Sequence, residues 1–95
     1  MNNLVWLENW FRQNCNGDWE HFHGVNIGTL DNPGWYVKID LKETDYANKQ
    51  IQELNQNIDN NNWITCSISE GVFRGYGDTL KLETIIGVFR NWISA

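Results

Sequence analysis

The chain has 95 residues and a net charge of −5, and 41% of its residues are hydrophobic, with six Trp among them. This composition excludes a disordered chain, which would be poor in aromatic residues, and it predicts one folded domain over residues 1–95. No segment is rich in Lys or Arg, so we expect no phosphate-neutralising surface and no nucleic-acid partner.

The N-terminus shows no basic segment followed by an apolar one, so we expect no signal peptide. The apolar runs are too short to cross a bilayer, which predicts no membrane association. Cys15 and Cys66 lie far apart and form no C-x-x-C pair. The simplest interpretation is a cytoplasmic protein with reduced thiols and no cofactor.

Residues 2–14, NNLVWLENWFRQN, have the spacing of a helix. Leu4, Leu7 and Phe11 recur at i, i+3 and i+7, with two Trp beside them, and would form the buried stripe. The asparagines at the start can cap the helix, and the glycine in the NCNGD run that follows can end it in a left-handed conformation.

Residues 19–30, WEHFHGVNIGTL, predict a strand, because apolar and polar residues alternate from Val25 onward and no helical period appears. On such a strand, His21 and His23 have the parity of Val25 and would face the helices. A bulge at Gly24 would turn both histidines to the opposite face, and the sequence leaves that alternative open.

Residues 31–34, DNPG, suit a type II turn with the glycine in the left-handed position. Residues 35–42, WYVKIDLK, are the clearest strand in the chain. Val37 and Ile39 reach the same face as the apolar residues of the preceding strand only if the connection has an odd number of residues. We therefore expect a five-residue loop over 30–34.

The second half of the chain predicts three more strands and a helix. Residues 43–62 are polar and rich in Asn, and an edge strand near 49–57 is favoured over a short helix. Residues 63–69 and 72–77 alternate around a two-residue Glu-Gly turn, which places Phe73 opposite Ile68. Asp78 or Thr79 would cap a final helix over 80–94.

These elements predict a two-layer α+β domain. An antiparallel sheet of about four to five strands would carry the N- and C-terminal helices on one face. The opposite face of the sheet would be open to water.

His21 and His23 form an H-x-H pair that could bind a metal. A zinc site needs a third protein ligand, and nothing in the sequence places Cys66, the soft candidate, nearby. Hydrogen-bonded structural histidines are favoured, and we expect no metal. Acid–base catalysis by the carboxylates needs a cleft for which a small two-layer domain has little room, so we expect no enzyme.

The open face of the sheet would carry large aromatic and acidic side chains. By alternation, eight candidate residues project from it: Asp18, Glu20, Phe22, Tyr36, Asp40, Trp63, Thr65 and Tyr76. Aromatic side chains surrounded by carboxylates on an open sheet are typical of protein-binding surfaces. The alternative is that Tyr36 and Trp63 only pack together as a cross-strand pair.

Four segments carry a resemblance to known proteins: WLENWF (6–11), GDWEHFHGVNIGTLDNPGWYVKIDL (17–41), WITCSISEGVFRGYG (63–77) and FRNWI (89–93). Together they resemble the immunity-protein-53 family of bacterial polymorphic-toxin systems, most specifically in GDWEH and TLDNPGW. Residues 43–62 match poorly. The resemblance implies a cytoplasmic α+β protein that neutralises a cognate toxin domain by binding it, without catalysis, and it supplies no list of contact residues.

The expected function is therefore occlusion of a cognate toxin domain that has a basic surface, since an acidic protein suits a basic partner. Tyr36 and Trp63 would be anchors, and Asp18, Glu20 and Asp40 would steer the encounter. Two alternatives are a small-ligand or carbohydrate-binding module that uses the same aromatic side chains, and a metal-dependent enzyme built on the histidines. The sequence leaves the oligomeric state open.

Overall fold

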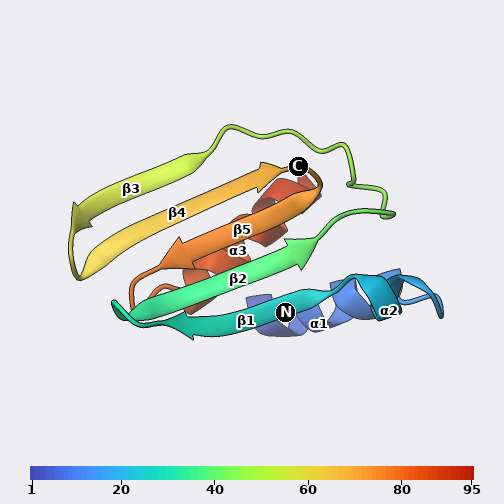
Figure 1. Ribbon diagram of the computed structural model, residues 1–95, viewed down its shortest axis with the longest axis horizontal. Helices are drawn as coiled ribbons and strands as arrows, with labels where there is room; N and C mark the ends of the chain where they lie inside the picture. The colour runs from blue at the N-terminus through green and yellow to red at the C-terminus, as the bar shows by residue number, and fades with distance from the viewer.

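The computed structural model describes residues 1–95. The elements in chain order are α1 (Asn3–Asn14), α2 (Trp19–Phe22), β1 (Val25–Leu30), β2 (Gly34–Asp40), β3 (Leu54–Asp59), β4 (Asn62–Ser69), β5 (Val72–Gly77) and α3 (Leu82–Ser94). The strands form one antiparallel sheet in the order β1-β2-β5-β4-β3. Figure 1 shows α1 and α3 behind the same face of this sheet. The predicted two-layer α+β fold is confirmed.

The β1–β2 hairpin has the register that the apolar pattern requires. Ile27 pairs with Val37, and the connection between the strands has an odd number of residues, as expected. The loop is shorter than predicted, because Leu30 and Gly34 already pair with each other. The prediction of a type II turn is wrong: the Asn32–Pro33 peptide is cis, and Gly34 begins β2 without a positive φ.

The β4–β5 hairpin matches its prediction. Its two turn residues, Glu70 and Gly71, have φ angles of 54° and 73°. Positive φ at both positions gives the type I′ geometry that suits the twist of two-residue hairpins. Ile68 and Phe73 are paired across the strands. Phe73 is therefore directed to the helix side, where it is fully buried.

An edge strand does lie in the polar middle segment, but it begins later than predicted. β3 covers Leu54–Asp59, whereas the sequence favoured 49–57. Its register against β4 shifts between Asn57 and Asp59. Almost the whole strand is exposed, which explains why neither an apolar alternation nor a helical stripe marked its bounds.

Helix α1 begins and ends as its sequence indicates. The Asn2 side chain accepts a hydrogen bond of 2.8 Å from the Val5 N–H, and Gly17 follows the helix with a φ of 94°. Its buried face differs from the predicted stripe. The helix buries Leu7 and Trp10, whereas its other two predicted stripe residues, Leu4 and Phe11, are 53% and 37% exposed.

The core lies between the sheet and α3, and Phe89 is at its centre. The Phe89 ring lies 5.0 Å from Phe73 of β5 and 5.1 Å and 5.8 Å from Trp10 and Trp6 of α1, measured between ring centroids. Phe89 is fully buried. One side chain therefore joins both helices to the sheet, through edge-to-face contacts with the two Trp rings and a tilted contact with Phe73.

The turn before α3 is fixed by Asp78 rather than by a helix cap. The helix begins at Leu82, so neither predicted cap residue caps it. The Asp78 carboxylate accepts hydrogen bonds from the Trp63 and Leu80 N–H groups, at 2.8 and 2.9 Å, and from Lys81 Nζ at 2.7 Å. The bond from Lys81, more than the backbone bonds, lowers the pKa of Asp78 to about 2. This nearly buried carboxylate ties β4 to the start of α3.

Candidate functional site

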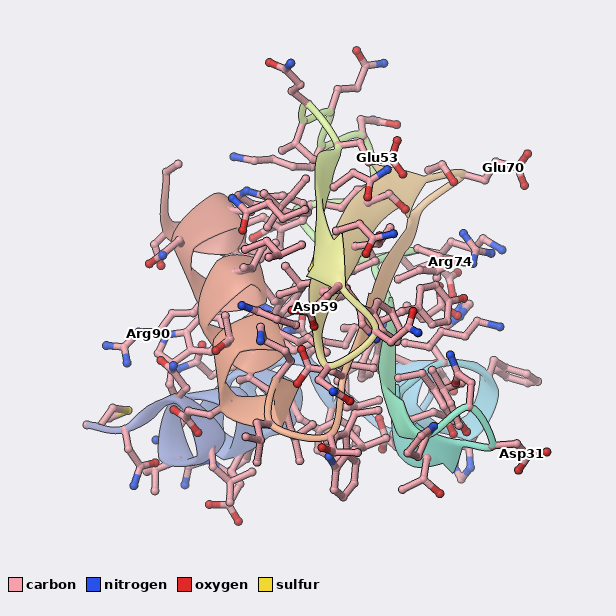
Figure 2. The ribbon with its side chains drawn as sticks, turned by 90° about the vertical axis from the view of Figure 1, so that its left-hand side faces the viewer. Asp31, Glu53, Asp59, Glu70, Arg74 and Arg90 are labelled. Carbon is pink, nitrogen blue, oxygen red and sulfur yellow. The ribbon has the colours of Figure 1, made fainter.

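The face of the sheet opposite the helices is uncovered. In Figure 2, α3 lies to one side of the strands, while Glu70 and Arg74 point to the other side. The strand registers place five of the eight predicted site residues on this open face: Tyr36, Asp40, Trp63, Thr65 and Tyr76.

An aromatic row crosses the open face near the β1–β2 turn. Tyr36 of β2 pairs with Tyr76 of β5, which is 37% exposed. The Tyr36 ring lies so close over Gly28 of β1 that it leaves no room for a Cβ there. Trp63 of β4 reaches across β5 to Gly34, where a Cβ would be 3.4 Å from the indole. Since β5 separates their strands, Tyr36 and Trp63 are not a cross-strand pair.

The middle of the open face carries two cations. Lys38 and Arg74 are directly paired across β2 and β5, and neither has a carboxylate partner within ion-pair distance. Arg74 donates only to Ser69, at 3.4 Å. The exposed carboxylates Asp31 and Glu70 lie instead at turns on the rim of the sheet (Figure 2). The face therefore has an aromatic row, a basic centre and acidic ends.

Three predicted site residues lie off the sheet, because the segment before β1 is the short helix α2 and not a strand. The Asn16 side chain accepts hydrogen bonds of 2.9 Å from both the Asp18 and Trp19 N–H groups. Glu20 accepts 2.9 Å bonds from the Asn16 and Gly17 N–H groups. A bond from its own backbone N–H, followed by the bonds from Asn16 and Gly17, lowers the pKa of Glu20, so this carboxylate holds its own loop together.

Burial of Trp19 explains why α2 replaces the expected strand at residues 19–22. Trp19 is 2% exposed, its ring lies 6.0 Å from that of Trp10, and its Nε1 donates to the Lys42 carbonyl at 2.9 Å. The local helix brings this indole into the core and leaves Phe22 78% exposed at its end. Residues 19–22 therefore form one helical turn with one buried and one exposed aromatic residue.

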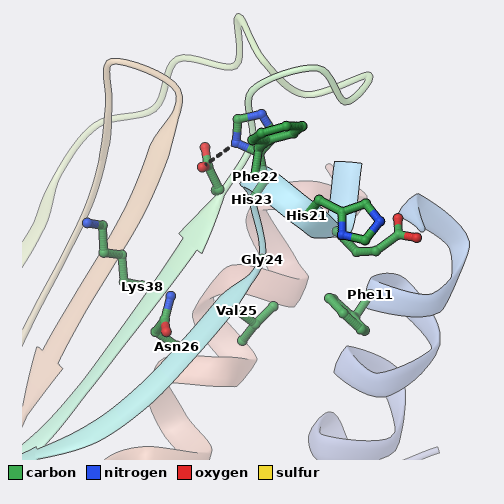
Figure 3. Close-up of a pocket in the computed structure, with 10 residues that line it drawn as sticks. Phe11, His21, Phe22, His23, Gly24, Val25, Asn26 and Lys38 are labelled. Atoms are coloured by element: carbon green, nitrogen blue, oxygen red, sulfur yellow. Dashed lines mark hydrogen bonds and ion pairs between the residues drawn. The ribbon is translucent and has the colours of Figure 1, made fainter. Parts of the chain in front are cut away.

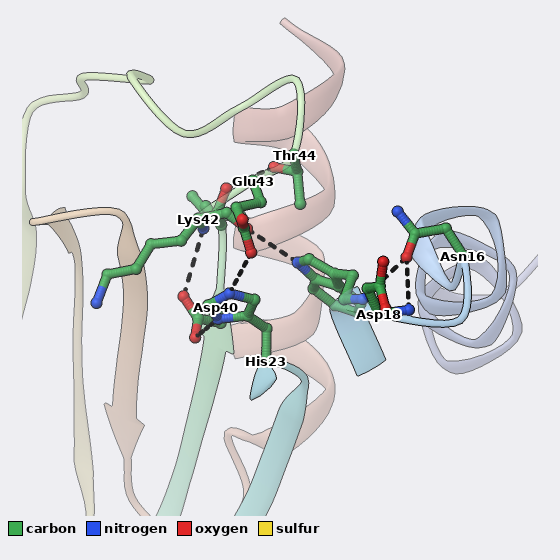
Figure 4. Close-up of polar contacts among 9 residues, drawn as sticks. Asn16, Asp18, His23, Asp40, Lys42, Glu43 and Thr44 are labelled. Atoms are coloured by element: carbon green, nitrogen blue, oxygen red, sulfur yellow. Dashed lines mark hydrogen bonds and ion pairs between the residues drawn. The ribbon is translucent and has the colours of Figure 1, made fainter. Parts of the chain in front are cut away.

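His23 is held between two carboxylates at the end of β2 (Figure 4). Its Nδ1 lies 2.6 Å from Asp40 and its Nε2 lies 2.9 Å from Glu43, which has a left-handed φ of 61°. The hydrogen bond to Asp40, with a smaller contribution from Glu43, raises the pKa of His23. Neither histidine faces the helices as predicted: His21 is exposed on α2, and His23 joins a carboxylate of the open face.

This cluster is a structural clamp. Both ring nitrogens of His23 already contact carboxylates, so neither is available to a nucleophile or a substrate. No group of three or more His, Cys, Asp or Glu side chains is arranged to hold a metal ion. Cys66 is buried in the core, and this burial raises the pKa of its thiol to about 12, which makes it a poor nucleophile.

We expect the His23 clamp to stabilise the fold mainly at acidic and neutral pH. Because its pKa is raised on folding, its contribution is complete below the unfolded value of about 6.5 and is lost as the pH rises through the folded value. His23→Gln should lower the Tm by a few degrees at about pH 6 and by much less at about pH 9. Thermal unfolding at both pH values measures this difference. The exposed His21→Gln is the control, and an equal loss at both pH values for His23→Gln would contradict the assignment.

Two open hollows flank β1, at the edge of the sheet. One, of about 480 Å³, lies around the start of the strand and is lined by α1, α2, β1 and β2 (Figure 3). The other, of about 270 Å³, lies between α1 and β1 and is lined almost entirely by apolar side chains. The two meet at Phe11 and Val25. The region was not predicted, because Leu4 and Phe11, which line it, have the spacing of a buried stripe.

The comparisons with known proteins give one match. Residues 4–94 match the family described as Immunity protein 53. No curated protein and no solved structure matches the chain. None of its helices is long and apolar enough to span a membrane. Because the matched region covers nearly the whole chain, and includes both terminal helices and all five strands, the protein belongs to the Immunity protein 53 family.

Proposed function

We propose that this protein binds a cognate bacterial toxin domain and neutralises it by occlusion. Membership in an immunity-protein family supports a toxin-neutralising role. Occlusion needs a surface that can be covered by another protein, and the open face of the sheet provides one on the side away from both helices. The proposed compartment is the cytoplasm of the protected cell, and no catalytic step is part of the proposal.

The aromatic row of Tyr36, Tyr76 and Trp63 is the observation that carries the choice of surface. Large rings at the centre of an interface supply most of its binding energy when a partner shields them from water. Here the Tyr36 ring packs against Gly28 and the Trp63 ring reaches Gly34, so both side chains are held in place by the sheet and need little reordering on binding. Thr65, which donates to Asn55 at 3.2 Å, extends the row with polar groups.

The charges of the chain favour a basic partner at long range. The net charge is −5, and carboxylates lie at the turns around the open face. Such a distribution speeds the encounter with a positively charged surface, such as the substrate groove of a nuclease. Asp40 and Glu20 contribute to this field, although each is also bonded within the chain. Lys38 and Arg74 would then face polar or acidic groups of the partner at the centre.

Co-expression tests the proposal directly. The probe is the C-terminal domain of the protein encoded directly upstream of this chain, produced in a host that it kills or arrests. We expect the chain to restore growth and to co-purify with the domain as an equimolar complex. An unrelated small acidic protein is the control for non-specific effects. Failure of both rescue and co-purification would overturn the proposed function for this toxin.

A further inference from the structure

We propose that the toxin domain is held by strand addition: one of its extended segments pairs with the free edge of β1 and places apolar side chains in the groove beside α1. This inference deepens the proposed function and rests on it. The contact lies at the edge of the sheet rather than on its open face, and the bound segment of the toxin domain is an extended strand.

The backbone of β1 has unpaired hydrogen-bonding groups. Asp40 N donates to Gly24 O at 3.0 Å, which marks these two residues as a hydrogen-bonded pair of the antiparallel ladder. Because such pairs alternate, the N–H and C=O groups of Val25, Ile27 and Thr29 point away from β2. No other bond in the chain uses them. A row of free donors and acceptors on an edge strand is a template for another strand.

The two edges of the sheet differ in how well they are protected. β3 is interrupted by a register shift, ends on the charged Asp59 and follows the charged Glu53, and both the shift and the charges oppose edge pairing. β1, with the sequence VNIGTL, is regular over six residues and contains neither a charge nor a proline. The unprotected edge is therefore the one that lies beside the hollows.

The groove beside β1 determines which side chains the added strand carries. It is lined by Leu4, Leu7 and Phe11 of α1 and by Val25 and Ile27 of β1, and its volume is about 270 Å³. Leu4 is 53% exposed and Ile27 is 39% exposed. Side chains of a strand alternate, so apolar residues at every second position of the partner would enter this groove while their backbone pairs with β1.

Charge decides between a foreign strand and a second copy of this chain. The one charged residue in the groove is Glu8, which forms no ion pair. A second copy would bring another Glu8 and another net charge of −5 to the same interface, where the like charges would repel each other. A strand that carries a basic residue beside its apolar ones complements both the groove and the whole chain. The occupant is therefore an apolar and basic strand of the toxin domain.

Edge-blocking variants test the inference on the complex with the upstream-encoded toxin domain. Thr29→Pro removes an outward N–H without removing a β1–β2 bond, and Ile27→Lys places a charge at the groove. Each should weaken binding by at least about 30-fold. Gln56→Lys, on the exposed β3 edge, is the matched control and should bind like the wild type. Circular dichroism confirms folding of each variant.

Amide hydrogen exchange gives an independent result. The Val25, Ile27 and Thr29 amides should exchange freely in the isolated chain and become protected in the complex. Unchanged affinity of both edge variants, or protection elsewhere only, would overturn the strand-addition inference while the proposed function stands. A concentration-dependent dimer of the isolated chain that Thr29→Pro abolishes would overturn the choice of occupant. Absence of any wild-type binding would overturn the proposed function and this inference with it.

Discussion

Replacing Phe89 with alanine should lower the free energy of unfolding by about 3–5 kcal/mol. The side chain is fully buried and packs against aromatic rings of α1 and β5. Truncation removes its buried apolar surface and leaves a cavity that rigid neighbouring rings cannot fill. Since domains of this size are stabilised by only about 5–15 kcal/mol, the loss is a large share of the total.

Equilibrium unfolding in urea measures this effect, because the midpoint and slope together give the free energy of unfolding. Thr84→Ala is the control on the same helix: Thr84 is exposed, so its replacement should change stability by no more than about 0.5 kcal/mol. A loss below about 1 kcal/mol for Phe89→Ala would contradict the central position assigned to this ring.

The strands that cross the middle of the sheet could be predicted because each buries one face. In β2 the burial alternates from Val37 onward: Val37 and Ile39 are fully buried, while Lys38 between them is exposed. The same alternation requires a connection to β1 with an odd number of residues, and the connection in the structure has an odd number. A one-residue slip would turn every apolar residue of the hairpin to water, so the register follows from the sequence alone.

The segment that contains α2 could not be predicted in this way, because its conformation depends on contacts distant in the sequence. The Trp19 indole packs against α1 and donates to the Lys42 carbonyl, 23 residues away. Backbone N–H groups then donate to the side chains of Asn16 and Glu20, and these hydrogen bonds stabilise one helical turn. Tertiary burial of one large ring and local capping together outweigh the strand conformation that the alternation after residue 24 predicts for residues 19–23.

The sequence favoured a hydrogen-bonded structural role for the histidines, and His23 has one, but its face and its two partners were not predicted, for a related reason. The chain departs from the strand at Gly24, so His23 reaches Asp40 on the face opposite to the one that its parity predicts. Its second partner, Glu43, is placed by a left-handed backbone conformation that is uncommon outside glycine and asparagine. The free edge of β1 had a signal in the sequence: VNIGTL lacks the charges that normally protect an edge strand.

Replacing Trp63 or Tyr36 with alanine should weaken the toxin complex by at least about 30-fold each, which corresponds to about 2 kcal/mol. Most of this loss should appear as faster dissociation, because anchors shield an interface after docking, whereas rim charges act on the encounter. Surface plasmon resonance or biolayer interferometry with the immobilised toxin domain separates the two rates.

The control for this pair of variants is Leu80→Ala. Leu80 is 85% exposed in the turn before α3, so its replacement removes a large apolar side chain that lies off the open face. Dissociation should then remain at the wild-type rate. If Trp63→Ala and Tyr36→Ala also dissociate at the wild-type rate while the β1 edge variants bind poorly, the toxin domain is held at the edge alone. Fast dissociation of both sets would show that one partner spans the edge of β1 and the aromatic row, since the Tyr36 ring already rests on Gly28 of the same strand.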